Sequence, residues 1–132
     1  MEIQTKVLPL GETGGLYSII SKEITGDGGV FRLRLNPECI IYKAHFPEQP
    51  ITPGVCITQI AVELAEIIVG HSLQMIVIKN VKFLSILTPD NQTEVTYNIT
   101  IKSSDDKETR IQAVAQSDDV VYAKMSLICK RL

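Results

Sequence analysis

The sequence predicts an α+β fold in which an antiparallel sheet wraps around one long central helix. Short segments rich in β-branched residues occupy both ends of the chain, and turn-forming residues separate them. Between them, the segment from Pro53 to about Val69 is apolar around most of its circumference, as expected of a helix covered by other structure. The order of two strands, one helix and four strands favours one helix lying on one curved sheet.

The first two strands are predicted to form a hairpin. Leu16–Thr25 is rich in β-branched residues, and Gly26–Gly29 is a turn signal. Val30–Leu35 then alternates apolar with charged side chains, which indicates one buried face. A polar loop that contains three prolines follows and leads to the helix.

The helix is predicted to begin with Thr52 as N-cap residue and Pro53 at the first helical position, where a missing N–H removes no hydrogen bond. Gln59, Glu63 and Glu66 recur at positions i, i+4 and i+7, so they form one polar stripe on a largely apolar helix. One interpretation gives the two carboxylates basic partners or solvent at a subunit junction.

The remaining strands are predicted from segments bounded by turn residues, and the last three form a meander. These segments are Met75–Leu84, Thr93–Lys102, Thr109–Ser117 and Val120–Cys129. Such a sheet leaves an apolar face and an edge to cover, and a second copy can cover both. We therefore expect one domain over residues 1–132 that assembles as a homodimer or a higher oligomer.

The composition excludes several functional classes. Apolar residues make up 45% and charged residues 21% of the sequence, and the net charge of −2 gives no reason to expect nucleic acid. No apolar stretch approaches the roughly 20 residues that span a bilayer, and no secretory signal is evident, so we expect a cytoplasmic protein without membrane contact. Cys39, Cys56 and Cys129 are widely spaced, which predicts three reduced thiols and no metal site.

The segment from Ala44 to Val55 carries the candidate chemistry. It delivers His45 on a proline-stiffened loop to the start of a helix, whose free N–H groups suit an oxygen that gains negative charge. Histidine suits removal of a proton near neutral pH. The segment is typical of a base beside an oxyanion hole, although one histidine near one helix also fits a structural residue.

The segment resembles the signature of the β-hydroxyacyl-acyl-carrier-protein dehydratases, which have the hot-dog fold. The matching residues are His45-Phe46-Pro47 and Pro53-Gly54-Val55, with Pro50 between them. The resemblance extends from Asn36 to the C-terminus and includes the strand that ends before Pro89. It implies an acyl tunnel beside the helix and an active site shared between two subunits.

The resemblance implies a role for each matching residue. His45 is the catalytic base, the amides of Gly54 or Val55 polarise the thioester carbonyl, and Phe46 and Pro53 also contact substrate. Gln59 stands where the family has its acid. Glutamine has no proton to release at neutral pH, but it can hydrogen-bond the departing hydroxyl and orient it, so Gln59 is a catalytic candidate. Glu63, one turn further on, keeps a carboxylate on the same face where the family typically has glutamine, and is a further catalytic candidate.

Three functions fit this sequence. The first is a lyase that dehydrates a 3-hydroxyacyl thioester of acyl carrier protein or coenzyme A to the 2-enoyl thioester, without a cofactor. The second is an acyl-binding subunit that is non-catalytic or depends on an active paralogue for the missing acid. The third, a thioesterase, needs a carboxylate to activate water, a role for Glu63.

Overall fold

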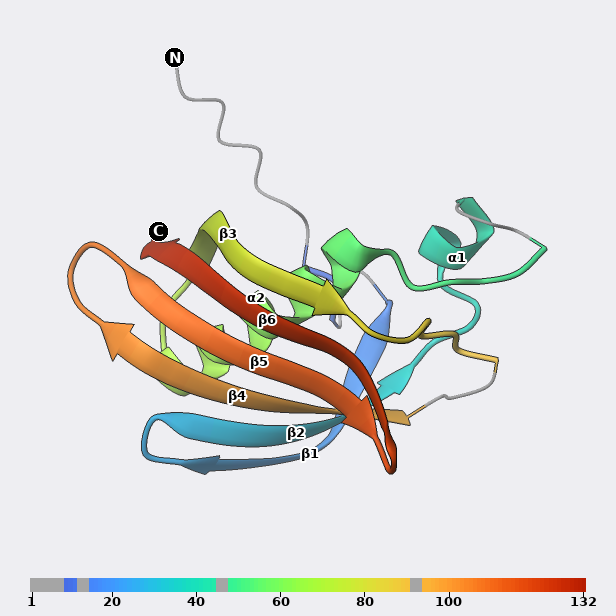
Figure 1. The fold of residues 1–132 in the computed structure, drawn as a ribbon, viewed down its shortest axis with the longest axis horizontal. Helices are drawn as coiled ribbons and strands as arrows, with labels where there is room; N and C mark the ends of the chain where they lie inside the picture. The colour runs from blue at the N-terminus through green and yellow to red at the C-terminus, as the bar shows by residue number, and fades with distance from the viewer. Residues whose placement is uncertain (1–8, 12–14, 45–47, 91–93) are drawn as a thin grey trace, which may run out of the picture.

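The computed structural model describes residues 9–11, 15–44, 48–90 and 94–132. Figure 1 shows a curved sheet with its longest helix lying behind the central strands. The predicted α+β fold is therefore confirmed. In chain order the elements are β1 (Tyr17–Thr25), β2 (Gly28–Leu35), α1 (Ile40–Ala44), α2 (Gly54–Val69), β3 (Leu73–Phe83), β4 (Glu94–Ser104), β5 (Thr109–Ser117) and β6 (Val120–Arg131).

The six strands form one antiparallel sheet in the order β1-β2-β4-β5-β6-β3. β4, β5 and β6 form the predicted meander. The chain leaves β2, crosses the sheet through α2, and returns as β3 on the far side of β6, as Figure 1 shows. β1 and β3 are consequently the two edges of the sheet within this chain.

The core lies between the sheet and α2. Alternate residues of β2 point toward the helix, and Phe31, Leu33 and Leu35 are buried there. From the helix, Ile60 and Leu64 are completely buried in the same core. This one-sided burial is what the period-two pattern of the strands predicts.

A tyrosine joins the two layers. The Tyr97 hydroxyl, on β4, donates to the backbone oxygen of Ile57 in α2 at 2.9 Å. Burial raises the pKa of Tyr97 well above its usual value, so the hydroxyl stays a donor. The hydrogen bond holds the first half of α2 at a fixed distance from the sheet.

The loop before α2 contains a helix that the sequence pattern did not predict. Asn36 organises it, since its side-chain oxygen accepts the N–H of Glu38 at 3.0 Å and its backbone oxygen accepts that of Cys39 at 3.1 Å. α1 then buries Tyr42. Five residues make too short a helix for hydrophobic periodicity to reveal.

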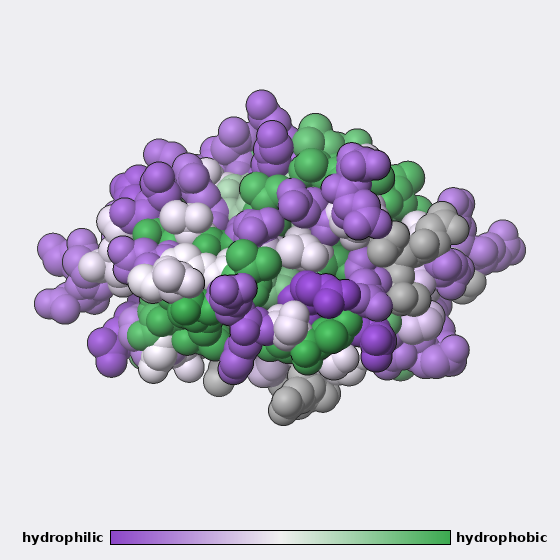
Figure 2. All heavy atoms as spheres, turned by 90° about the horizontal axis from the view of Figure 1, so that it is seen from below, coloured by the Kyte–Doolittle hydropathy of each residue, from purple (hydrophilic) through white to green (hydrophobic). Residues whose placement is uncertain are grey.

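Both edges of the sheet expose apolar side chains. Figure 2 views the molecule from the lower side of Figure 1 and shows apolar patches among polar groups. On β1, Ile19, Ile20 and Ile24 are each about two-fifths exposed.

No helix within the described ranges has the length and hydropathy required to cross a membrane.

Candidate active site

The start of α2 differs by one residue from the prediction. Pro53 is the N-cap residue, in extended conformation with φ −60° and ψ 145°, and the helix begins at Gly54. Thr52 is thus one residue before the N-cap, and its hydroxyl lies 2.8 Å from the hydroxyl of Tyr42 in α1. The N-cap residue offers no side-chain acceptor. The first N–H groups of the helix, on Gly54 and Val55, therefore lie at the positive end of the helix dipole without a side-chain cap.

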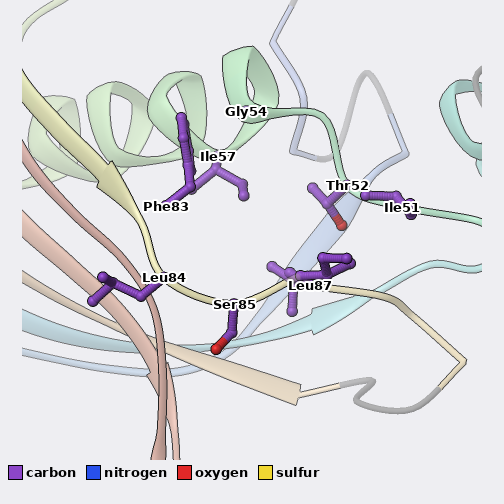
Figure 3. Close-up of a pocket in the computed structure, with 9 residues that line it drawn as sticks. Ile51, Thr52, Gly54, Ile57, Phe83, Leu84, Ser85 and Leu87 are labelled. Atoms are coloured by element: carbon purple, nitrogen blue, oxygen red, sulfur yellow. The ribbon is translucent and has the colours of Figure 1, made fainter.

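An apolar cavity of about 350 Å³ opens at this helix start. One wall is the segment that enters α2, and the other is the segment that leaves β3. The Thr52 N–H donates to the Leu87 oxygen at 2.8 Å and ties the two walls together. Figure 3 shows the arrangement of the lining residues, which are Ile51, Thr52, Gly54, Ile57, Phe83, Leu84, Ser85, Ile86 and Leu87.

The predicted substrate-binding residues lie differently around this cavity. Gly54 lines it, whereas Val55 is 68% exposed and does not. Pro53 precedes the helix and adjoins the lining. His45 and Phe46 lie outside the described residues, so their predicted roles remain predictions. Phe83 and Leu87, which line the cavity from the end of β3 and beyond it, were not singled out in the sequence as site residues.

The polar stripe of α2 meets the N-terminal part of the chain. Glu63 is only 9% exposed, and its carboxylate accepts four hydrogen bonds. One oxygen, Oε2, accepts the Leu10 N–H at 2.8 Å and the Gln59 side-chain amide at 3.2 Å. The other, Oε1, accepts the Gly11 N–H at 3.1 Å and the Tyr17 hydroxyl at 2.8 Å.

These partners of Glu63 are all neutral. In the part of the chain that the structure describes, no lysine or arginine forms an ion pair with this carboxylate. Within the described residues, neutral donors therefore hold the Glu63 carboxylate, and a basic partner at a subunit junction stays a prediction. Burial first, and then the Glu63 charge, raise the pKa of Tyr17 far above its usual value, so Tyr17 remains a donor.

Glu66 holds the far end of the same helix. Its Oε2 accepts the N–H of Leu73, the first residue of β3, at 2.7 Å. Glu63 and Glu66 also border a second cavity, of about 390 Å³, beside β1. Sequence reasoning missed Tyr17 and the segment before it as parts of this site, since nothing in their pattern points to the helix.

The thiols and the carboxylates of the described residues offer little for other chemistry. Cys39, Cys56 and Cys129 are all buried, as predicted for small apolar residues, and they form no disulfide with one another. Burial raises the pKa of Cys56, near the helix start, which makes its thiol a poor nucleophile near neutral pH. Within the described ranges, no three His, Cys, Asp or Glu side chains are grouped to hold a metal ion.

Comparison with known proteins identifies the family. The family model of the ApeI-like proteins, described as ApeI dehydratase, matches residues 21–125, which is most of the chain. The chain belongs to the ApeI-like dehydratase family. The predicted resemblance to β-hydroxyacyl-acyl-carrier-protein dehydratases is therefore confirmed at the level of the family.

A curated relative supports the same assignment. A 3-hydroxyacyl-[acyl-carrier-protein] dehydratase FabZ of Solibacter usitatus (strain Ellin6076) is 25% identical over 97 residues. That alignment covers 67% of this chain and 59% of the relative, so the chain spans about three-fifths of the relative's length.

Solved structures of the ApeI-like and other proteins share the fold. The dehydratase heterocomplex ApeI:P from Xenorhabdus doucetiae superposes with a TM-score of 0.73 at 20% identity, covering 86% of this chain and 96% of that chain. A hypothetical thioesterase from Streptococcus pneumoniae TIGR4, solved with coenzyme A, has a TM-score of 0.64 at 8% identity and covers 88% and 85%. The hot-dog fold predicted from the sequence is thus confirmed.

Proposed function

We propose that this chain dehydrates a 3-hydroxyacyl thioester to the 2-enoyl thioester in the cytoplasm. The observation that carries the proposal is the apolar cavity at the start of α2, whose lining includes Gly54. Such a cavity suits an acyl chain, and the free N–H groups beside it suit the thioester carbonyl. The acyl group is carried by acyl carrier protein or coenzyme A, by analogy with the FabZ relative and the thioesterase structure.

In this proposal His45 moves the proton. The imidazole takes the proton from C2, and the electron pair passes to the thioester oxygen, which the Gly54 or Val55 amide stabilises. The enolate then reforms its carbonyl as the double bond forms between C2 and C3. The C3–O bond breaks, and the imidazolium returns its proton to the leaving hydroxyl, which departs as water. The elimination is redox-neutral and uses no cofactor.

We also propose that two copies pair along β3. This strand of 11 residues is an edge of the sheet, and Ile76, Val77 and Ile78 are each about half exposed there. An apolar edge with unpaired backbone groups is the kind of surface that a second strand covers. The Xenorhabdus doucetiae structure is described as a heterocomplex, so a related subunit is the alternative partner for the β3 edge.

Separate replacement of the chain's two histidines tests the proposed activity. A 3-hydroxyacyl thioester is supplied on acyl carrier protein or on coenzyme A, and the absorbance of the enoyl product is followed. His45→Ala is expected to lower kcat by about 10²- to 10⁴-fold, since it removes the general base. His71→Ala is the matched control, because His71 follows α2 and its Nδ1 atom lies 3.3 Å from the backbone oxygen of Ser72.

The assay also separates the other functions. Binding of the acyl thioester without turnover, in a protein that folds, would favour the acyl-binding subunit, for which an added paralogue should restore turnover. Release of free thiol without enoyl product would favour a thioesterase. The four hydrogen bonds on Glu63 count against that function, since they leave its carboxylate no free lone pair to activate water.

A further inference from the structure

The four donors around Glu63 determine which way the amide of Gln59 faces. An ionised carboxylate only accepts hydrogen bonds, and its two oxygens together offer about four acceptor positions. The N–H groups of Leu10 and Gly11 and the hydroxyl of Tyr17 occupy three of them. Only the Nε2 end of Gln59 can take the fourth, because its oxygen would face the negative charge.

The orientation of this amide leaves its oxygen turned away from Glu63. Glu63 is nearly buried, and its hydrogen bonds to residues 46 to 53 positions earlier in the chain hold it in place. Gln59 is partly buried on the same stripe, one turn closer to the start of α2. The end of Gln59 that remains for a ligand is therefore an acceptor.

We propose that Glu63 is a positioning residue that fixes Gln59 with its carbonyl oxygen toward the substrate. The oxygen then accepts a hydrogen bond from the C3 hydroxyl of a 3-hydroxyacyl thioester. The naming of this hydroxyl rests on the proposed dehydration, whereas the orientation of Gln59 does not.

Repulsion between carboxylates explains why Gln59 and Glu63 carry the opposite residue types to those that the family resemblance implies at these two positions. An acid at position 59 would lie against the Glu63 carboxylate, at about the 3.2 Å that now separates Gln59 Nε2 from Glu63 Oε2. Two carboxylates at that distance cannot both be ionised without a large cost. Glu63 and Gln59 therefore form one unit, in which a carboxylate at one position requires an amide at the other.

Nuclear magnetic resonance of the wild-type protein tests the orientation without any turnover. The side-chain ¹⁵N–¹H₂ pair of Gln59, assigned by its loss in Gln59→Glu, is expected to be shifted from free glutamine and slow to exchange with water. Glu63→Gln should move this pair toward the free values, while Glu66→Gln on the same helix should not. A Gln59 pair that is free in wild type, or unmoved in Glu63→Gln, overturns the proposal.

Kinetics test the role of the free oxygen. Glu63→Gln is expected to lower kcat by about 10-fold or more with KM little changed, as for a group misplaced by about 1 Å, and Glu66→Gln should stay close to wild type. Gln59→Glu alone should also lower kcat. In the double variant with both Gln59→Glu and Glu63→Gln, kcat relative to wild type should be about 10-fold higher than the product of the relative kcat values of the two single variants.

The exchanged protein should also gain a titrating group. Its kcat/KM should acquire a further pH dependence that wild type lacks, because Gln59→Glu places a carboxyl, which ionises at acid or near-neutral pH, beside the substrate hydroxyl. The single variant Glu63→Gln is the control, and its profile should keep the wild-type shape. An unchanged profile in the exchanged protein would overturn the contact between position 59 and the reacting hydroxyl.

Discussion

The ring of Phe83 lies directly on Gly54 at the first turn of α2, as Figure 3 shows. A methyl group added to Gly54 would lie 2.7 Å from the Cζ atom of the Phe83 ring, closer than such atoms approach. Both residues line the cavity, so their contact sets its width at the helix start.

Gly54→Ala is therefore expected to displace the Phe83 ring and weaken acyl binding by about 10-fold, roughly the worth of a misfitted methylene. Phe83 is 53% exposed, so its ring can move and the protein should remain folded. Gly54→Ala combined with Phe83→Ala should recover part of the loss. Titration with an acyl-pantetheine thioester measures the effect, and an equal loss in single and double variants would contradict it.

The hydroxyls of Tyr42 and Thr52, 2.8 Å apart, close the base of the loop that contains His45. Both residues are buried, so Tyr42→Phe leaves the Thr52 hydroxyl without this partner and should lower the free energy of unfolding by about 1–3 kcal/mol. The double variant with Thr52→Val should cost less than the sum of the two single changes. Urea denaturation of all four proteins checks this, and strict additivity would show that the pair is not coupled.

A matched pair of valines tests the dimer along β3. Val77 on β3 and Val30 on β2 are each 43% exposed, but of these two strands only β3 lies at an edge of the sheet. Val77→Asp should convert the dimer to monomers, since it places a charge in the interface, while Val30→Asp should leave it intact. Sedimentation velocity distinguishes the two. Monomeric wild type at micromolar concentration, or dissociation by both variants, would refute the proposed interface.

Stability should fall at alkaline pH. Burial raises the pKa of Cys129 from its ordinary 9.0 to about 12, and that of Tyr42 from 10.0 to about 12. Because both folded values lie above the unfolded ones, their stabilising effect is complete below pH 9 and is lost as the pH rises through about 12. Urea midpoints should fall over this window, and less steeply in Cys129→Ala. Equal slopes would contradict the assignment to Cys129.

The sequence predicted the strands and the long helix because their signals are local. Alternation in β2 and the apolar run of α2 are visible within a few residues. The environment of Glu63 was not predictable in this way, because three of its donors come from residues that precede it by 46 to 53 positions. Spacing along the helix showed that Gln59 and Glu63 share a face. It did not show that the Gln59 amide would donate a hydrogen bond to the Glu63 carboxylate.

The position of β3 in the sheet has a consequence for how the chain folds. β3 directly follows α2, yet its only strand partner among the described residues is β6, which comes after β4 and β5. During synthesis the apolar residues of β3 therefore have no partner strand in this chain until most of the chain has emerged. Pairing over this sequence distance is slow, so we expect the β3 amides to gain protection late in pulsed hydrogen exchange.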